Sequence, residues 1–154
     1  MHIDDTLNKL KVKRVVKDFS QMYDVNFTNT FASTVKFDTL RLFLVFVALK
    51  NLKCHQVDVN NAFIELFLNE IIYMHASLDV DLSSDQCLLI RRSLYDLKQA
   101  ARDWHKRCIK KLLKLDFEQC VANSCMLRHK EKDIILLIYV DDICIAVKTL
   151  QQIQ

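Results

Sequence analysis

The stretch that decides the fold is Asp133-Ile-Ile-Leu-Leu-Ile-Tyr-Val-Asp141-Asp142-Ile-Cys-Ile-Ala-Val147, near the end of the 154-residue chain. Two apolar, β-branched runs of strand length flank an acidic pair, which predicts two buried strands joined by a tight turn. Aspartate is a common turn residue, so a solvated turn would explain the pair. Two adjacent acids between buried strands are also an electrostatic cost that a bound cation removes, and a metal-holding hairpin is therefore the alternative.

The composition is that of one globular domain. Hydrophobic residues make up 51% of the chain, which is enough for a core at this length. No apolar run approaches the ~18 residues that a membrane helix requires, and the first residues lack the pattern of a secretory signal. The six cysteines lie mostly within apolar runs, where a free thiol behaves as a small hydrophobe. We therefore expect a reduced, intracellular protein with no membrane association.

Glycine and proline are both missing from the sequence. Average usage would supply about 11 glycines and about 8 prolines. Left-handed backbone positions must then be filled by aspartate, asparagine or strained residues. We expect a lower stability than the hydrophobic content alone would give.

The rest of the chain alternates between helix and strand patterns. Apolar alternation predicts strands at 9–16, 54–60, 71–74, 86–92 and 125–129, and helical spacing predicts helices at 39–50 and 100–115. The first helix is rich in apolar residues, so we expect it to be largely buried, with Asp38 as its N-cap. Interspersed helices and strands that end in tight hairpins indicate an α+β fold, with an antiparallel sheet packed on helices.

Two further features bear on function. Asp58 follows a short alternating run and is aimed away from Val57 and Val59, and active sites use carboxylates placed in this way at the end of a core strand.

The 22 lysines and arginines give a net charge of only +3, but they gather at 9–17 and 98–114. This clustering is a weak signal for nucleic-acid or phosphate binding, and a solvated basic face is the common alternative.

Three segments carry a combined signature. They are Cys54-His-Gln-Val-Asp-Val-Asn-Asn-Ala-Phe63, Ser93-Leu-Tyr-Asp-Leu-Lys-Gln-Ala-Ala-Arg102 with Trp104, and Tyr139-Val-Asp-Asp-Ile143. In this order they resemble the central motifs of the reverse transcriptase of copia-type LTR retrotransposons. The similarity runs from about Lys11 to the end of the chain.

The resemblance implies a fold and an activity for the chain. The fold would be the fingers and palm of a right-hand polymerase, with an antiparallel palm sheet packed on helices. Residues 1–154 would form a single partial reverse transcriptase domain, with the thumb, RNase H and integrase absent and the other polyprotein domains needed for full function. The activity would be RNA-directed DNA polymerisation, in which deoxynucleoside triphosphates extend a primer 3′-hydroxyl on an RNA or DNA template.

By the same resemblance, Asp58, Asp141 and Asp142 are the catalytic carboxylates. Together with the backbone carbonyl of Val59 they would hold two Mg²⁺ ions ~3.5–4 Å apart, one activating the primer hydroxyl and the other stabilising the leaving pyrophosphate. An all-oxygen ligand set suits Mg²⁺.

The resemblance also assigns residues to the incoming nucleotide. Lys11 and Lys13 match basic positions that would hold the triphosphate, and Phe63 matches the bulky residue that would exclude a ribose 2′-hydroxyl. The residues themselves leave alternatives open, because the lysines also fit an exposed strand and Phe63 also fits the core.

Further along the chain, Gln99 and Arg102 fall in the motif that lines the nucleotide and template pocket. Tyr139 would touch the primer end, although its position fits ordinary packing equally well. Trp104, in the same motif, is interpreted as a core residue.

The chain also departs from the family pattern. Asp18, Asp79, Asp96 and Asp116 stand where the family usually has glycine, and Ser33, Ser77, Leu78, Ala101 and Ser124 stand where it usually has proline. Asp96 adds a side chain and a negative charge beside the expected triphosphate site. The alternative function is therefore a catalytically dead retrotransposon relic with at most weak nucleic-acid binding.

Overall fold

The computed structural model describes residues 16, 18–75, 80, 83, 85–149 and 151. The elements are η1 (Asp18–Ser20), α1 (Phe37–Leu49), β1 (Lys53–Asp58), β2 (Phe67–Met74), β3 (Leu88–Arg92), α2 (Ala100–Leu113), β4 (Phe117–Cys120), β5 (Asn123–His129), β6 (Ile134–Tyr139) and β7 (Asp142–Val147). The expected α+β class with an antiparallel sheet is confirmed. Lys11, Lys13 and the strand expected at 9–16, apart from Val16, lie outside the described residues.

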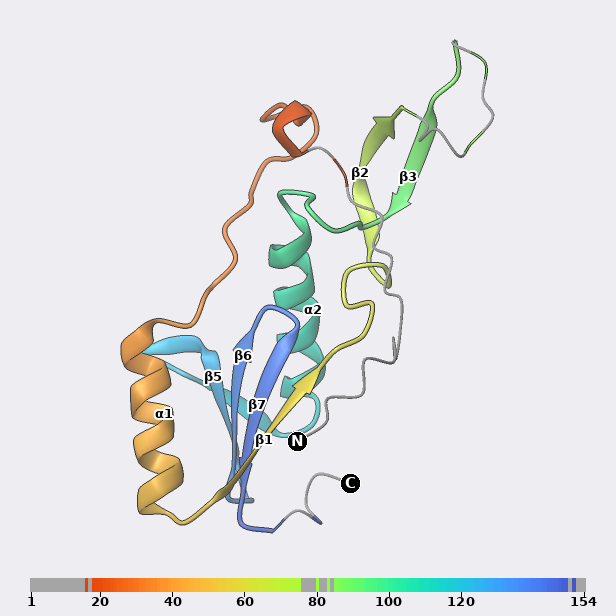
Figure 1. Ribbon diagram of the computed structural model, residues 1–154. Coiled ribbons are helices and arrows are strands. Elements are labelled where there is room, and N and C mark those ends of the chain that lie inside the picture. Colours follow the sequence, from red (N-terminus) through yellow and green to blue (C-terminus); the bar gives the residue numbers. More distant parts are fainter. Residues whose placement is uncertain are drawn as a thin grey trace, which may run out of the picture.

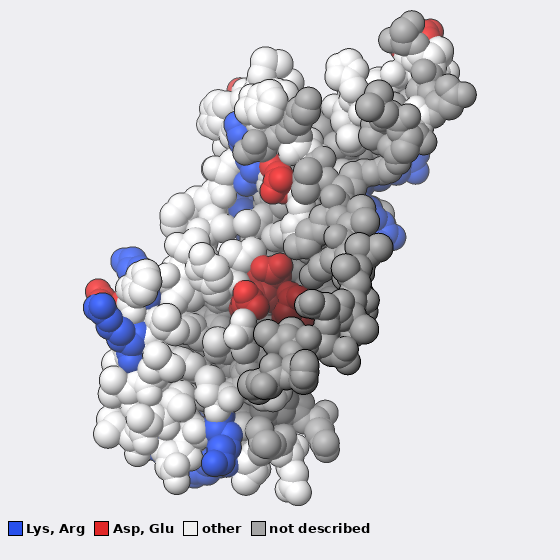
Figure 2. Space-filling model, in the orientation of Figure 1, with Lys and Arg blue, Asp and Glu red and all other residues white. Residues whose placement is uncertain are grey.

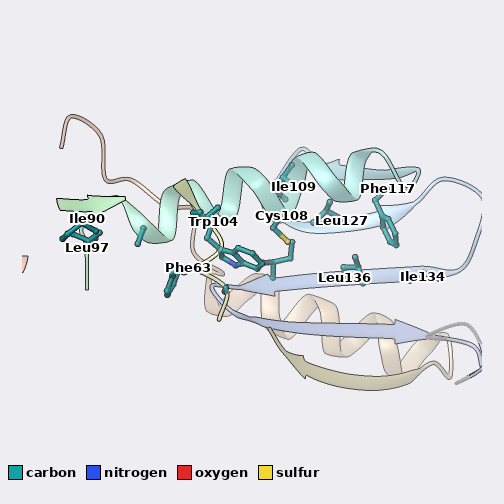
Figure 3. Close-up of a cluster of buried hydrophobic side chains, with 14 of the residues drawn as sticks. Phe63, Ile90, Leu97, Trp104, Cys108, Ile109, Phe117, Leu127, Ile134 and Leu136 are labelled. Atoms are coloured by element: carbon teal, nitrogen blue, oxygen red, sulfur yellow. The ribbon is translucent and has the colours of Figure 1, made fainter. Parts of the chain in front are cut away.

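A five-stranded antiparallel sheet in the order β1-β7-β6-β5-β4 lies between the two helices. Because side chains alternate across a strand, each face of the sheet packs against a different helix (Figures 1 and 3). Trp104, Cys108 and Ile109 of α2 share one buried cluster with sheet residues such as Leu136. Phe43 of α1 shares a second cluster with the opposite face. The molecule therefore has three layers.

Strands β2 and β3 form a separate two-stranded sheet that projects beyond the main sheet (Figure 1). One face is fastened to the larger core through Ile72 and Ile90, which pair in register and are buried. The other face leaves Ile71 and Tyr73 exposed. The strands expected at 71–74 and 86–92 are found, and β2 begins earlier, at Phe67.

Helix α1 lies close to its expected position, but the expectation that it is largely buried is wrong. Phe43 is its buried residue, whereas Val45 is 51% and Leu49 78% exposed. The sheet covers one narrow stripe of the helix, and apolar residues elsewhere on the helix face solvent. Asp38 lies in the first turn, and the N-cap is Lys36, which makes no side-chain capping hydrogen bond.

Helix α2 and the final hairpin agree with their sequence patterns. Helix α2 spans Ala100–Leu113, buries Trp104 and Cys108, and keeps basic residues in its last turn. Strands β6 and β7 flank Val140 and Asp141. Strand β4 was not expected, because its four residues carry only one large apolar side chain, the buried Phe117. Neither helix in the described part of the chain is long and apolar enough to cross a membrane.

The backbone confirms the expectation for a chain without glycine. Among the described residues, positive φ angles occur at Asp24, Asn51, Asn61, Asp96, Asp116 and Val140. Five of these six are aspartate or asparagine, whose short polar side chains tolerate the left-handed region best. Val140 is the exception, because β-branched residues are genuine outliers there.

Candidate active site

The acidic residues meet at one end of the main sheet. Strand β1 pairs with β7 so that Asp58 lies opposite Asp142, and β6 pairs with β7 so that Tyr139 also lies opposite Asp142. Residues directly opposite in antiparallel strands project to the same face. Asp58, Asp142 and Tyr139 therefore form a row across three strands, with Asp141 in the adjoining turn. Acidic side chains gather in the middle of the face in Figure 2, near the β6–β7 turn of Figure 1.

The turn that carries Asp141 has an unusual backbone. Its two central residues are Val140 and Asp141, and the positive φ of Val140 (55°) with none at Asp141 fits a type II′ turn. That turn normally takes glycine at the position of Val140. A residue held in so sparsely populated a region persists only where its surroundings enforce it.

Two hydrogen bonds from other elements hold this turn. The indole Nε1–H of Trp104, on α2, donates to the Val140 carbonyl at 2.7 Å. The backbone N–H of Val59, directly after β1, donates to the Asp141 carbonyl at 2.9 Å. Both central carbonyls of the turn are thus anchored, one by a helix and one by the neighbouring strand.

The carboxylates differ in their surroundings. Gln56 Nε2 donates to Asp142 Oδ1 at 3.0 Å, Asp141 and Asp142 are half-buried, and Asp58 is exposed. Within the described ranges, no three His, Cys, Asp or Glu side chains are arranged closely enough to hold a metal ion. Neighbouring carboxylates repel one another unless a cation lies between them. The strand register sets Asp58 opposite Asp142, and carboxylate oxygens are the donors that hard divalent cations such as Mg²⁺ prefer.

The two aromatic residues assigned to the substrate lie in different environments. Phe63 is 7% exposed and packs edge-on against Tyr95, with ring centroids 4.8 Å apart and an interplanar angle of 82°. Tyr139 is 55% exposed and stands beside the acids in the row. Tyr139 is thus accessible to a ligand, whereas Phe63 belongs to the buried cluster.

Gln99 and Arg102 are engaged by the segment before α1. Gln99 is fully buried: its amide nitrogen donates to the Asn26 carbonyl at 3.1 Å and its amide oxygen accepts from Gln21 Nε2 at 3.2 Å. Arg102 pairs with Asp103 at 2.7 Å and donates to the Asn29 carbonyl. Both residues therefore connect the start of α2 to the segment before α1. Their role toward a substrate stays a prediction.

Sequence reasoning missed three contributors to this region. Gln21 lies in a polar, irregular stretch that gives no sign of burial, and Gln56 looks like an ordinary exposed strand residue. Trp104 was interpreted as core only. Its ring is indeed buried (Figure 3), but its N–H also serves the turn. A buried indole needs an acceptor, which is the signal that could have found this contact.

A histidine and a cysteine meet nearby without forming a reactive pair. His105 Nε2 lies 3.9 Å from Cys125 Sγ. Burial lowers the pKa of the His105 imidazole and raises the pKa of the Cys125 thiol. Both shifts favour the neutral forms, so this contact packs α2 on β5 and supplies no thiolate.

Comparison with known proteins places this geometry in a family. Residues 2–154 match the sequence model of the family described as reverse transcriptase (RNA-dependent DNA polymerase). The Retrovirus-related Pol polyprotein from transposon RE1 of Arabidopsis thaliana is 32% identical over 148 residues, covering 93% of this chain and 10% of the relative. The corresponding polyprotein from transposon TNT 1-94 of Nicotiana tabacum is 32% identical over 150 residues, covering 94% of this chain and 11% of the relative.

Similarity extends more weakly to yeast. The Transposon Ty1-NL2 Gag-Pol polyprotein of Saccharomyces cerevisiae is 23% identical over 133 residues, covering 82% of this chain and 7% of the relative. No solved structure matches the chain. The chain spans about a tenth of the length of the plant relatives. Because the family model covers nearly all of it, the chain belongs to the reverse transcriptase (RNA-dependent DNA polymerase) family, as a segment of the kind found in retrotransposon Pol polyproteins.

Proposed function

We propose that this chain forms part of the fingers and palm of an RNA-directed DNA polymerase, and that Asp58, Asp141 and Asp142 are its catalytic carboxylates. The observation that carries the proposal is the register of β1 and β7, which sets Asp58 opposite Asp142 at the end of the sheet. Acids from segments far apart in the sequence thereby converge. Nucleotidyl transfer with two divalent ions needs this arrangement.

The chain's own residues divide the work at this site. Asp58, Asp141, Asp142 and the Val59 carbonyl would hold two Mg²⁺ ions through oxygen ligands. When bound, the ions would activate the primer 3′-hydroxyl and stabilise the leaving pyrophosphate. Gln56 orients Asp142 through its 3.0 Å hydrogen bond, and the anchored turn orients Asp141.

The proposed substrates are a template–primer and deoxynucleoside triphosphates. Exposed Tyr139, beside the acids, would contact the primer end. Phe63 would lie beneath the sugar of the incoming nucleotide, where a rigid ring excludes a 2′-hydroxyl, and Lys11 and Lys13 would neutralise the triphosphate.

Intramolecular contacts suggest how the remaining pocket residues act. Buried Gln99 would shape the nucleotide pocket by holding the segment around Asn26, and Arg102 would do so through Asn29. The six free cysteines support an intracellular location.

Asp96 favours a second candidate function, that of an inactive relic. It is exposed, has a φ of 68° and carries a negative charge in the segment expected to line the triphosphate. A carboxylate there would repel the substrate. The two functions therefore differ in whether this chain incorporates nucleotides.

Primer extension on an RNA template with Mg²⁺ separates the two functions. We expect the full chain to extend the primer, and Asp141→Asn to reduce incorporation by about 100-fold or more, because a metal ligand supplies several kcal/mol of transition-state stabilisation. Asp133→Asn is the matched control, since Asp133 pairs with Lys148 at the other end of β6 and β7. Asp96→Gly should raise incorporation. Extension by neither the wild-type chain nor Asp96→Gly would establish the relic.

A further inference from the structure

We propose that Trp104 is a positioning residue for catalysis, whose indole N–H holds the β6–β7 turn in its observed conformation and thereby fixes the direction of the Asp141 side chain. This inference rests on the proposed function, because it concerns how the metal-holding acids are aimed. It goes beyond that function by assigning a catalytic consequence to a residue that touches neither substrate nor metal.

Trp104 hydrogen-bonds to the peptide whose orientation decides the turn type. Type I′ and type II′ turns differ by a flip of the central peptide, which here joins Val140 and Asp141. The carbonyl of this peptide belongs to Val140 and accepts the Trp104 hydrogen bond at 2.7 Å. A flip would break that bond and turn φ of Asp141 from negative to positive. The side-chain direction of Asp141 would change with it.

The second anchor leaves Asp141 little freedom while Trp104 is in place. Val59 N–H fixes the next carbonyl, that of Asp141, at 2.9 Å. Because a peptide unit is planar, fixing the two units on either side of Asp141 fixes both of its backbone dihedrals. The Cα–Cβ direction of Asp141 is then set by α2 on one side and by β1 on the other.

Val140 makes this lock necessary. Its β-branched side chain occupies a left-handed position at φ 55°, so the intrinsic preference of the turn opposes the observed conformation. Trp104 can oppose that preference because its ring is buried between α2 and the sheet (Figure 3). An indole N–H is a donor only, so a buried one is fully committed to its acceptor.

The test compares metal binding in variants of the full chain. Trp104→Phe keeps a ring and removes the N–H, and Ile109→Val trims another buried residue of α2 without touching the turn. Free Mn²⁺, measured by electron paramagnetic resonance, reports binding without any need for turnover. We expect Trp104→Phe to weaken Mn²⁺ binding by about 10-fold or more, and Ile109→Val to bind within about 2-fold of the wild type.

A second substitution guards against a folding defect. Trp104 is the only tryptophan in the sequence, so global replacement of tryptophan by benzothienylalanine alters this position alone. The analogue keeps the two-ring shape and lacks the N–H. It should weaken Mn²⁺ binding as Trp104→Phe does, while circular dichroism and cooperative unfolding match the wild type. In primer extension, kcat should fall about 10-fold or more and KM for the nucleotide should change little.

The outcomes separate this inference from the proposed function. Wild-type affinity for Mn²⁺ in the benzothienylalanine protein would overturn the role of the N–H and leave the proposed function standing. An equal loss of Mn²⁺ affinity in Ile109→Val would also overturn the role of the Trp104 N–H, because general loosening of α2 would then explain the effect. A wild-type chain that binds no Mn²⁺ would overturn the proposed function and this inference together.

Discussion

Two turns of the molecule place a non-glycine residue where glycine is normally required, and they are held very differently. The turn Tyr139–Asp142 has Val140 at φ 55°, and both of its central carbonyls accept hydrogen bonds of 2.7 and 2.9 Å from other elements. The turn Leu94–Leu97 has Asp96 at φ 68°, the position that a type II turn reserves for glycine. Its closing hydrogen bond, from Leu97 N–H to the Leu94 carbonyl, is long at 3.5 Å, and its central carbonyl, that of Tyr95, accepts a 3.3 Å hydrogen bond from Val16 N–H.

The difference shows that an unfavourable φ by itself does not identify a functional site. The backbone cost is larger for the β-branched Val140 than for Asp96, and the hydrogen bonds that oppose relaxation are shorter in the Val140 turn than in the Asp96 turn. The strain at Val140 is enforced by α2 and by Val59, and the acids beside it gain a fixed direction. At Asp96 weaker hydrogen bonds oppose the backbone cost of the positive φ angle. Replacing Asp96 by glycine should therefore raise the free energy of unfolding.

The largest expected effect comes from removing the support of the Val140 turn. Trp104→Ala should lower the free energy of unfolding by about 3–5 kcal/mol, because it leaves a cavity under the turn and an unsatisfied carbonyl. Urea denaturation measures the change. Lys106→Ala, an exposed change on the same helix, should stay within about 0.5 kcal/mol. Similar values for the two variants would mean that α2 does not hold the turn.

Glycine at the other turn should act in the opposite direction. Asp96→Gly should raise the free energy of unfolding by about 1 kcal/mol, since it removes a left-handed non-glycine residue. Asp103→Gly, inside α2, is the matched control and should lower stability, because glycine is the poorer helix former and the ion pair with Arg102 is lost. Chemical denaturation of both variants decides the point. A loss of stability in Asp96→Gly would show that the Asp96 turn is supported after all.

Glycine at position 140 should have a smaller net effect on stability. Val140→Gly relieves the strain but also removes a side chain packed against the larger core cluster, so the free energy of unfolding should change by less than about 1 kcal/mol. Incorporation of nucleotides should fall, because a flexible residue lets the turn sample other conformations. If Val140→Gly gained as much stability as Asp96→Gly, the contrast between the turns would disappear.

The smallest expected effect is a pH dependence of stability from His105, which lies on α2, the helix that holds the Val140 turn. Burial lowers the pKa of His105 in the folded chain, so the unfolded chain binds more protons as pH falls through the unfolded pKa near ~6.5. Stability should therefore be lower at pH 5.5 than at pH 7.5, as urea midpoints would show. His105→Gln should reduce this slope, whereas His55→Gln, at an exposed position of β1, should keep it. An unchanged slope in His105→Gln would contradict the assignment.

Much of the fold follows from local patterns in the sequence. The acidic hairpin, β1 and α2 could be predicted because apolar periodicity and turn residues are local signals. The burial of α1 could not, since its composition says how apolar the helix is and not how much of it the sheet covers. Strand β4 was missed because pairing with β5, a tertiary contact, makes it a strand.

The site was predictable in its residue types and less so in its contacts. Asp58, Asp141 and Asp142 stand out as acids next to apolar strands, and the register brings Asp58 and Asp142 opposite each other. The burial of Gln99 could not be foreseen, because its partners Gln21 and Asn26 lie more than 70 positions away. The hydrogen bond of Trp104 likewise depends on how α2 docks on the sheet.

The position of β1 at the end of the strand order has a consequence for local opening. Strand β1 pairs with β7 alone within the main sheet, whereas β7 and β6 each have two neighbours among the described strands. Edge strands open at lower free energy than central ones, so amides of β1 should exchange with solvent before those of β6 and β7. Asp58 would then leave the site while Asp141 and Asp142 stayed in place. The three carboxylates would therefore separate in two steps. Loss of Asp58 would accompany fraying of the edge strand, and loss of Asp141 and Asp142 would require opening of the central hairpin.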